Sequence, residues 1–142
     1  MRETTAEAQI RLVLVDPQAL FRASLSHFLA AHACLEVVGE CGSAAEARVL
    51  LAGSSVDIAL LDLDLRTEDG EALITAARRA GYQGRFLVVA GTAGARGLAD
   101  VIKLGASGIF LKSESPERLV LAIRLGSQRR RLGGSEGHPA SR

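Results

Sequence analysis

The chain has 142 residues, of which 48% are hydrophobic and 23% are charged, and its formal net charge at pH 7 is +1. That length fits one domain with a sizeable core, and the near-neutral charge gives no electrostatic reason to expect a nucleic-acid-binding surface. No stretch approaches the roughly 20 apolar residues that cross a bilayer, and the amino terminus lacks the apolar core of a signal peptide. We therefore expect one cytoplasmic domain that has no contact with a membrane.

Short apolar runs recur five times along the chain, and each is bounded by turn-forming residues. Such runs are typical of strands that are buried on both faces of a sheet. The expected strands are residues 10–15, 35–41, 57–61, 85–90 and 107–111. Each run leads into a segment with the periodicity or the end signals of a helix. The expected helices begin at Asp16-Pro17, at Ser43, at Gly70, after Gly94 and at Ser115.

Several of these helices carry recognisable end signals. Asp16 is a candidate N-cap, with Pro17 at the first helical position, where proline is well tolerated. Ser43 and Glu46 have the spacing of a capping box. The expected fourth helix has only a weak helical pattern and ends near Gly105, and the expected last helix runs to about Arg130.

Five strand–helix units in series predict the fold. Right-handed crossovers between successive strands give a parallel sheet that is covered by helices on both faces. We expect an α/β protein, a flavodoxin-like (βα)5 three-layer sandwich with the strand order 2-1-3-4-5. Residues 1–8 and 127–142 fall outside the pattern, so a domain over residues 9–126 is expected between an N-terminal tail and a C-terminal tail or linker.

Charged residues follow three of the expected strands. Asp16 follows the first, Asp62 follows the third with Asp64 close behind, and Lys112 follows the fifth. In a doubly wound sheet, sites form beyond the carboxyl ends of the strands, near the point where the strand order reverses. Two or three carboxylates with one lysine are suited to a Mg²⁺ site, or to activating one Asp as a phosphoryl acceptor. Each of these residues also has a purely structural alternative. Asp16 could serve only as a helix cap, and Asp62 could form an ion pair with Lys112 that has no function beyond stability.

The sequence resembles the receiver domains of two-component response regulators, of the NarL/LuxR type, over about residues 10 to 126. The segments that carry the resemblance are residues 15–22 (VDPQALFR), 36–40 (EVVGE), 60–63 (LLDL) with Asp69-Gly70, and 104–112 (LGASGIFLK). The resemblance implies that Asp62 is the phospho-acceptor and that Lys112 pairs with the phosphoryl group. It also implies a metal site formed by Asp16, Asp62 and the carbonyl of Asp64.

The chain departs from the family pattern at positions that matter for this chemistry. The family has two adjacent acidic residues after the first strand, and here the second is Pro17. At the end of the fourth strand, the family has a hydroxyl residue that contacts the phosphoryl group, and this chain has Ala90 there. Where the family has its switch aromatic, this chain has Ile109. The resemblance therefore implies an acceptor and a lysine with an incomplete metal site and an incomplete switch, so Mg²⁺ binding should be weak or absent.

From these residues we expect an atypical receiver domain in signal transduction, in transcription regulation, and not an enzyme. Its phosphorylation at Asp62 would be weakened or lost, and it would act in dimerisation or partner docking. Expected partners are a sensor histidine kinase and a second copy of the chain, since the last helix is more apolar than one buried stripe requires. The sequence stops before a helix-turn-helix domain could begin, so DNA would be bound only through a domain absent from this chain.

Two alternative functions remain. The first is a conventional receiver that accepts a phosphoryl group at Asp62. The second is a haloacid-dehalogenase-like phosphatase, because Asp62-Leu63-Asp64 resembles the DxD nucleophile motif of that family and Thr67 lies nearby. That motif normally follows the first strand, and its threonine lies four residues after the nucleophile instead of five.

Overall fold

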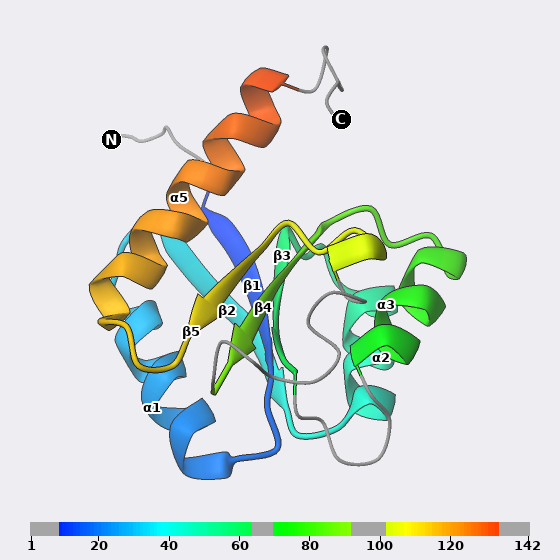
Figure 1. The fold of residues 1–142 in the computed structure, drawn as a ribbon, viewed down its shortest axis with the longest axis horizontal. Coiled ribbons are helices and arrows are strands. Elements are labelled where there is room, and N and C mark those ends of the chain that lie inside the picture. Colours follow the sequence, from blue (N-terminus) through cyan, green and yellow to red (C-terminus); the bar gives the residue numbers. More distant parts are fainter. Residues whose placement is uncertain (1–8, 64–69, 92–101, 134–142) are drawn as a thin grey trace.

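A computed structural model describes residues 9–63, 70–91 and 102–133, and it confirms the predicted sheet. Five strands, all parallel to their neighbours, pair in the order β2-β1-β3-β4-β5 (Figure 1). The strands are β1 (Ile10–Val15), β2 (Leu35–Cys41), β3 (Ile58–Asp62), β4 (Arg85–Ala90) and β5 (Gly108–Leu111). The third strand begins and ends one residue later than expected, so Asp62 is the last residue of the strand instead of the first residue of the loop.

Helices cover both faces of the sheet in the part of the chain that the structure describes. The helices α1 (Ala19–Ala30) and α5 (Pro116–Gly133) lie on one face, and α2 (Ala44–Gly53) and α3 (Gly70–Arg79) lie on the other (Figure 1). The expected fourth helix falls largely on residues 92–101, outside the described residues. Its predicted end agrees with the structure, because residues 102–103 are helical and Gly105 then adopts a positive φ of 109°.

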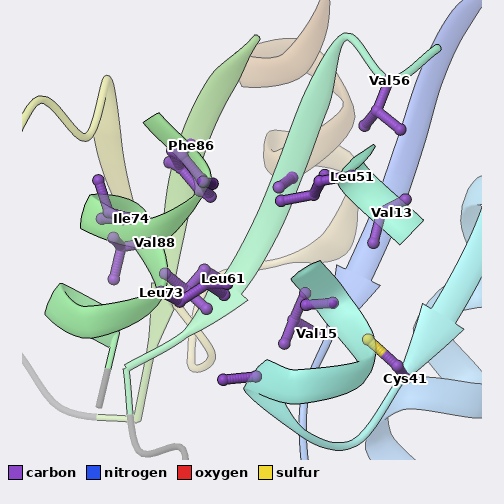
Figure 2. Close-up of a cluster of buried hydrophobic side chains, with 14 of the residues drawn as sticks. Val13, Val15, Cys41, Leu51, Val56, Leu61, Leu73, Ile74, Phe86 and Val88 are labelled. Atoms are coloured by element: carbon purple, nitrogen blue, oxygen red, sulfur yellow. The ribbon is translucent and has the colours of Figure 1, made fainter. Parts of the chain in front are cut away.

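Two apolar clusters fill the layers between the sheet and the helices. Alternate residues of one strand point to opposite faces, so Val13 and Val15 pack toward α2 and α3, whereas Leu12 and Leu14 pack toward α1 and α5. Figure 2 shows the first cluster, in which the labelled side chains are Val13, Val15, Cys41, Leu51, Val56, Leu61, Leu73, Ile74, Phe86 and Val88. Burial on both faces explains why the strands appear in the sequence as continuous apolar runs.

The predicted start of the first helix is wrong. Helix α1 begins at Ala19, with Gln18 at the N-cap position, so Asp16 is not its cap and Pro17 precedes the helix. The Oδ1 atom of Asp16 accepts a hydrogen bond of 2.8 Å from the backbone N–H of Gln18, two residues on. This Asx-turn competes with helical capping, and it leaves the other carboxylate oxygen free to face the end of the sheet.

The remaining helix ends largely follow the sequence signals. The Ser43 Oγ accepts a hydrogen bond from the N–H of Glu46 at 3.2 Å, which confirms the cap of α2. Gly81, at a φ of 101°, follows α3 in a conformation that favours glycine. Helix α5 continues to Gly133, three residues beyond its expected end. None of the described helices combines the length and the apolar character of a bilayer-spanning segment.

A pair of leucines on α1 tests this packing. Leu29 is fully buried against the sheet, whereas Leu20 on the same helix is 82% exposed. We expect Leu29→Ala to lower the free energy of unfolding by about 2–5 kcal/mol, because it leaves a cavity in the core. Leu20→Ala should change it by less than about 0.5 kcal/mol. Urea denaturation of the two variants gives both values, and equal losses would contradict the placement of α1.

Candidate functional site

The carboxyl ends of the strands bring together three residues that the sequence places far apart. Val15 of β1 pairs with Leu61 of β3, so Asp16 and Asp62, the next residues along, lie at the same edge of the sheet. Lys112 directly follows β5, and its backbone N–H donates a 2.8 Å hydrogen bond to the carbonyl of Ala90 at the end of β4. The side chain of Lys112 reaches from there toward both carboxylates.

The ammonium group of Lys112 lies between the two carboxylates. Its Nζ is 3.4 Å from Oδ2 of Asp16 and 3.6 Å from Oδ1 of Asp62. Asp16 is 5% exposed and Asp62 is 2% exposed, and these are the charged residues of the described core. Burying a carboxylate is costly unless an opposite charge or hydrogen bonds compensate it, so the position of Lys112 accounts for the burial of both acids.

Two further residues hold the lysine, and sequence reasoning assigned neither of them to the site. The Lys112 ammonium donates a short hydrogen bond to Oε1 of Gln18, and its Nζ lies 4.4 Å from the centre of the Phe21 ring. An ammonium at this distance from an aromatic face makes a favourable cation–π contact. Phe21 belongs to the apolar stripe of its helix, and no spacing rule in the sequence distinguishes it as a site residue.

Arg22 positions the Asp16 loop from its outer side. Its Nη1 donates a 2.6 Å hydrogen bond to the backbone carbonyl of Asp16, and its Nε lies 3.3 Å from Oε1 of Glu40 on β2. The loop is thereby tied to both α1 and β2. Sequence reasoning missed this contact as well, because it joins residues from different elements.

The structure also describes the three positions at which the resemblance led us to expect an incomplete site. Pro17 offers no side-chain ligand beside Asp16. Ala90 is fully buried at the end of β4 and presents only a methyl group. Ile109 is paired with Val88 and is 37% exposed on β5. Asp64, the expected third metal residue, lies outside the described residues, as does Asp69.

The donor atoms of the site fit the ligand chemistry of Mg²⁺. This ion commonly uses one or two carboxylates and completes its coordination with waters and phosphoryl oxygens, and Asp16 and Asp62 supply two carboxylates. Within residues 9–63, 70–91 and 102–133, no three His, Cys, Asp or Glu side chains gather in a way that could hold a metal. The Lys112 ammonium stands beside both carboxylates.

Cys41 ends β2 near this edge of the sheet, but its thiol is unsuited to nucleophilic chemistry. Burial raises the pKa of Cys41 to about 11, and the negative charge of Glu46 adds to that effect. The thiolate is the reactive form, so this residue is protonated and inert at neutral pH.

A five-stranded parallel sheet with an aspartate and a lysine converging at its carboxyl edge is the architecture of a signalling receiver. The chain belongs to the response regulator receiver domain family, whose sequence model matches residues 12–124. It is similar to the nitrate/nitrite response regulator protein NarP of Escherichia coli, with 30% identity over 118 residues. It also has 30% identity over 115 residues to the DNA-binding transcriptional activator DevR/DosR of Mycobacterium tuberculosis.

Each of these matches covers part of a longer relative. The NarP match spans 83% of this chain and 55% of NarP, and the DevR/DosR match spans 81% and 53%. The chain therefore spans about half the length of the curated relatives it matches.

Solved structures agree with the fold. The signal receiver domain of the putative response regulator NarL from Mycobacterium tuberculosis has a TM-score of 0.79 and 26% identity, and the match covers 86% of this chain and 98% of that one. A two-component response regulator of the LuxR family from Aurantimonas has a TM-score of 0.76 and 28% identity, with coverage of 83% and 84%. The NarL/LuxR-type resemblance is thus confirmed.

The two cysteines allow a direct check of the described packing. Cys41 is buried and its pKa is about 11, so a thiol-specific reagent such as iodoacetamide should modify it very slowly at pH 8. Cys34 is only partly buried and should react first. Intact mass against time should show one modification well before the second, and peptide mapping should place the first on Cys34. Modification of Cys41 first would contradict the packing of β2 against α2.

Proposed function

We propose that this domain is an atypical receiver in transcription control, in which phosphorylation of Asp62 is weakened or lost and the output is dimerisation or partner docking. One observation carries the proposal. The site keeps its acceptor carboxylate and its lysine, but Pro17 and the buried methyl group of Ala90 stand where the family has a second acid and a hydroxyl.

The geometry supports a limited role for Asp62 as an acceptor. A phosphoryl group would be transferred to a carboxylate oxygen of Asp62, and Lys112 is placed to pair with its oxygens. Mg²⁺, when bound by Asp16 and Asp62, would neutralise charge on the transferring group. Losing one of the acids weakens this site because both a ligand and a negative charge are removed.

The second weakened feature is the conformational switch that would respond to phosphorylation. A phosphoryl group changes a conformational equilibrium only if the two conformations contact it differently. Ala90 has no hydroxyl to be drawn toward a phosphoryl group, and Ile109 lacks the reach of an aromatic side chain. Phosphorylation at Asp62 would therefore have little effect on the rest of the domain.

An apolar surface on α5 supports the proposed docking role. We call the exposed side chains of Leu121 and Leu125, one helical turn apart on α5 beside the edge strand β5, the β5–α5 face, and they are 55% and 47% exposed. Exposed apolar side chains that neighbour each other on a helix are typical of an interaction site, and a two-fold symmetric dimer would cover them on both copies.

The wider setting of the domain is also part of the proposal. Its relatives include a protein named as a response regulator and another named as a DNA-binding transcriptional activator. By analogy, we place the domain in the cytoplasm, with a sensor histidine kinase as its possible phosphodonor. DNA would be bound through a domain outside this chain, and the domain itself would turn over no external substrate.

The conventional receiver remains the second candidate, because Asp16, Asp62 and Lys112 retain the arrangement that a phospho-accepting site needs. The phosphatase alternative has no comparable support, since Asp62 is the last residue of the third strand of a receiver fold. Hydrolysis of a generic aryl phosphate by the wild-type protein would support the phosphatase function.

A set of four proteins tests the proposed loss of switching. Asp62→Asn should match the wild type in its dimer dissociation constant within about twofold, roughly 0.4 kcal/mol, because neither Ala90 nor Ile109 can transmit the presence of a phosphoryl group to the rest of the domain. Pro17→Asp should raise Mg²⁺ binding and phosphorylation without changing assembly, and adding Ala90→Thr should begin to couple the two. Sedimentation with and without a small phosphodonor, together with intact mass, measures both quantities.

One outcome of that comparison would overturn the proposal. If the wild type dimerises about tenfold more tightly on phosphorylation, about 1.4 kcal/mol, and Asp62→Asn loses this gain, the domain is a conventional receiver.

The proposed dimer face has its own test. Leu121→Glu places a charge in the β5–α5 face and should shift a dimer toward monomer at about 50 μM, a concentration chosen for a weak interface. Leu20→Glu, on the far more exposed Leu20 of α1, makes the same chemical change outside that face and should leave the assembly unchanged. A monomeric wild type at that concentration, or equal loss of dimer in both variants, would count against the face.

A further inference from the structure

We infer that Gln18 is a positioning residue that holds the Lys112 ammonium against both carboxylates of the acidic site and thereby lowers the affinity of that site for a divalent metal. This inference rests on the proposed function, since it concerns the same site. It goes further by naming the residues that determine how strongly the site binds Mg²⁺.

The Lys112 ammonium makes one hydrogen bond to a side-chain oxygen and forms ion pairs with two others. An ammonium carries three N–H donors and no acceptor. Three side-chain oxygens converge on it: Oε1 of Gln18, Oδ2 of Asp16 at 3.4 Å and Oδ1 of Asp62 at 3.6 Å. The face of Phe21, centred 4.4 Å away, lies against the same group. The lysine is therefore enclosed by its partners, and its side chain is only 18% exposed.

This arrangement places the lysine in competition with a metal for the same two carboxylates. Both carboxylates that could bind Mg²⁺ already face a positive charge, and a divalent ion placed beside them would be repelled by that charge at short range. The low exposure of Asp16 and Asp62 makes the repulsion stronger, because water screens it poorly there. Either the ammonium moves away when the metal binds, or the metal binds weakly.

Gln18 influences which of these occurs. Its hydrogen bond joins the loop before α1 to a residue 94 positions away, after β5. Its backbone N–H is held in turn by Oδ1 of Asp16. The Asx-turn therefore orients Gln18 so that its amide oxygen anchors the ammonium beside the carboxylates. Without that anchor, the flexible lysine stem could turn outward, and the carboxylates would be available to a metal.

Titration of Mg²⁺ alone, followed by calorimetry and by thermal unfolding with and without about 10 mM Mg²⁺, tests this inference. Lys112→Met removes the charge and keeps a chain of similar length. Lys103→Met is its matched control, because Lys103 is exposed and the net charge changes equally. Gln18→Ala removes the anchor and keeps every charge. Gln9→Ala is its control, since the Gln9 side chain also makes one long-range hydrogen bond, which it donates to the carbonyl of Ala33.

We expect Lys112→Met to bind Mg²⁺ at least about tenfold more tightly than the wild type, and its melting temperature to rise with Mg²⁺. Gln18→Ala should bind about threefold more tightly, and both controls should match the wild type. If Lys112→Met does not fold without metal, recovery of its folding by Mg²⁺ would support the inference, and Gln18→Ala still tests it.

Unchanged Mg²⁺ affinity in Lys112→Met and Gln18→Ala, with both folded, would overturn the inference. A purely structural role for Gln18 would lower the melting temperature and leave the affinity unchanged. The proposed function fails by a different readout, namely phosphorylation-dependent dimerisation of the wild type, so the two failures are distinguishable.

Discussion

The pairing of one ammonium with two buried carboxylates is the interaction on which the functional end of this domain depends. Asp16 and Asp62 are brought side by side because β1 and β3 are neighbours in the sheet, and both are almost completely buried. Two carboxylates in such a position repel each other and lose their hydration. Lys112, at the end of β5, supplies the compensating charge. The strand order therefore places the two acids together, and the lysine after β5 makes their burial tolerable.

The same interaction limits what the site can do. Asp62 already has a cation beside it, so any metal or phosphoryl group must enter a site whose charge is partly compensated. The proposed loss of switching adds to this limit, because Pro17 offers no ligand to a metal and Ala90 offers no hydroxyl to a phosphoryl group.

Under the proposed function, output from the domain comes from its surface more than from its acidic edge. Helix α5 lies beside β5, the strand that Lys112 directly follows, and Leu125 lines a groove with Gly108 and Ile109 of that strand. The backbone bond from Lys112 to Ala90 holds the end of β5 against β4.

The sequence by itself determined the strands, the strand order and three of the site residues, whereas the tertiary structure alone decided how those residues are held. Apolar runs and glycine positions are local signals, and Asp16, Asp62 and Lys112 could be found because each lies at the end of a strand or directly after it. Gln18, Phe21 and Arg22 could not be found, because their contacts join α1 and its loop to β2 and to the end of β5. Asp16 was mistaken for a helix cap for a related reason. An aspartate before a helix can accept from either of two backbone N–H groups, and only packing against Lys112 and Arg22 decides which geometry is lower in free energy.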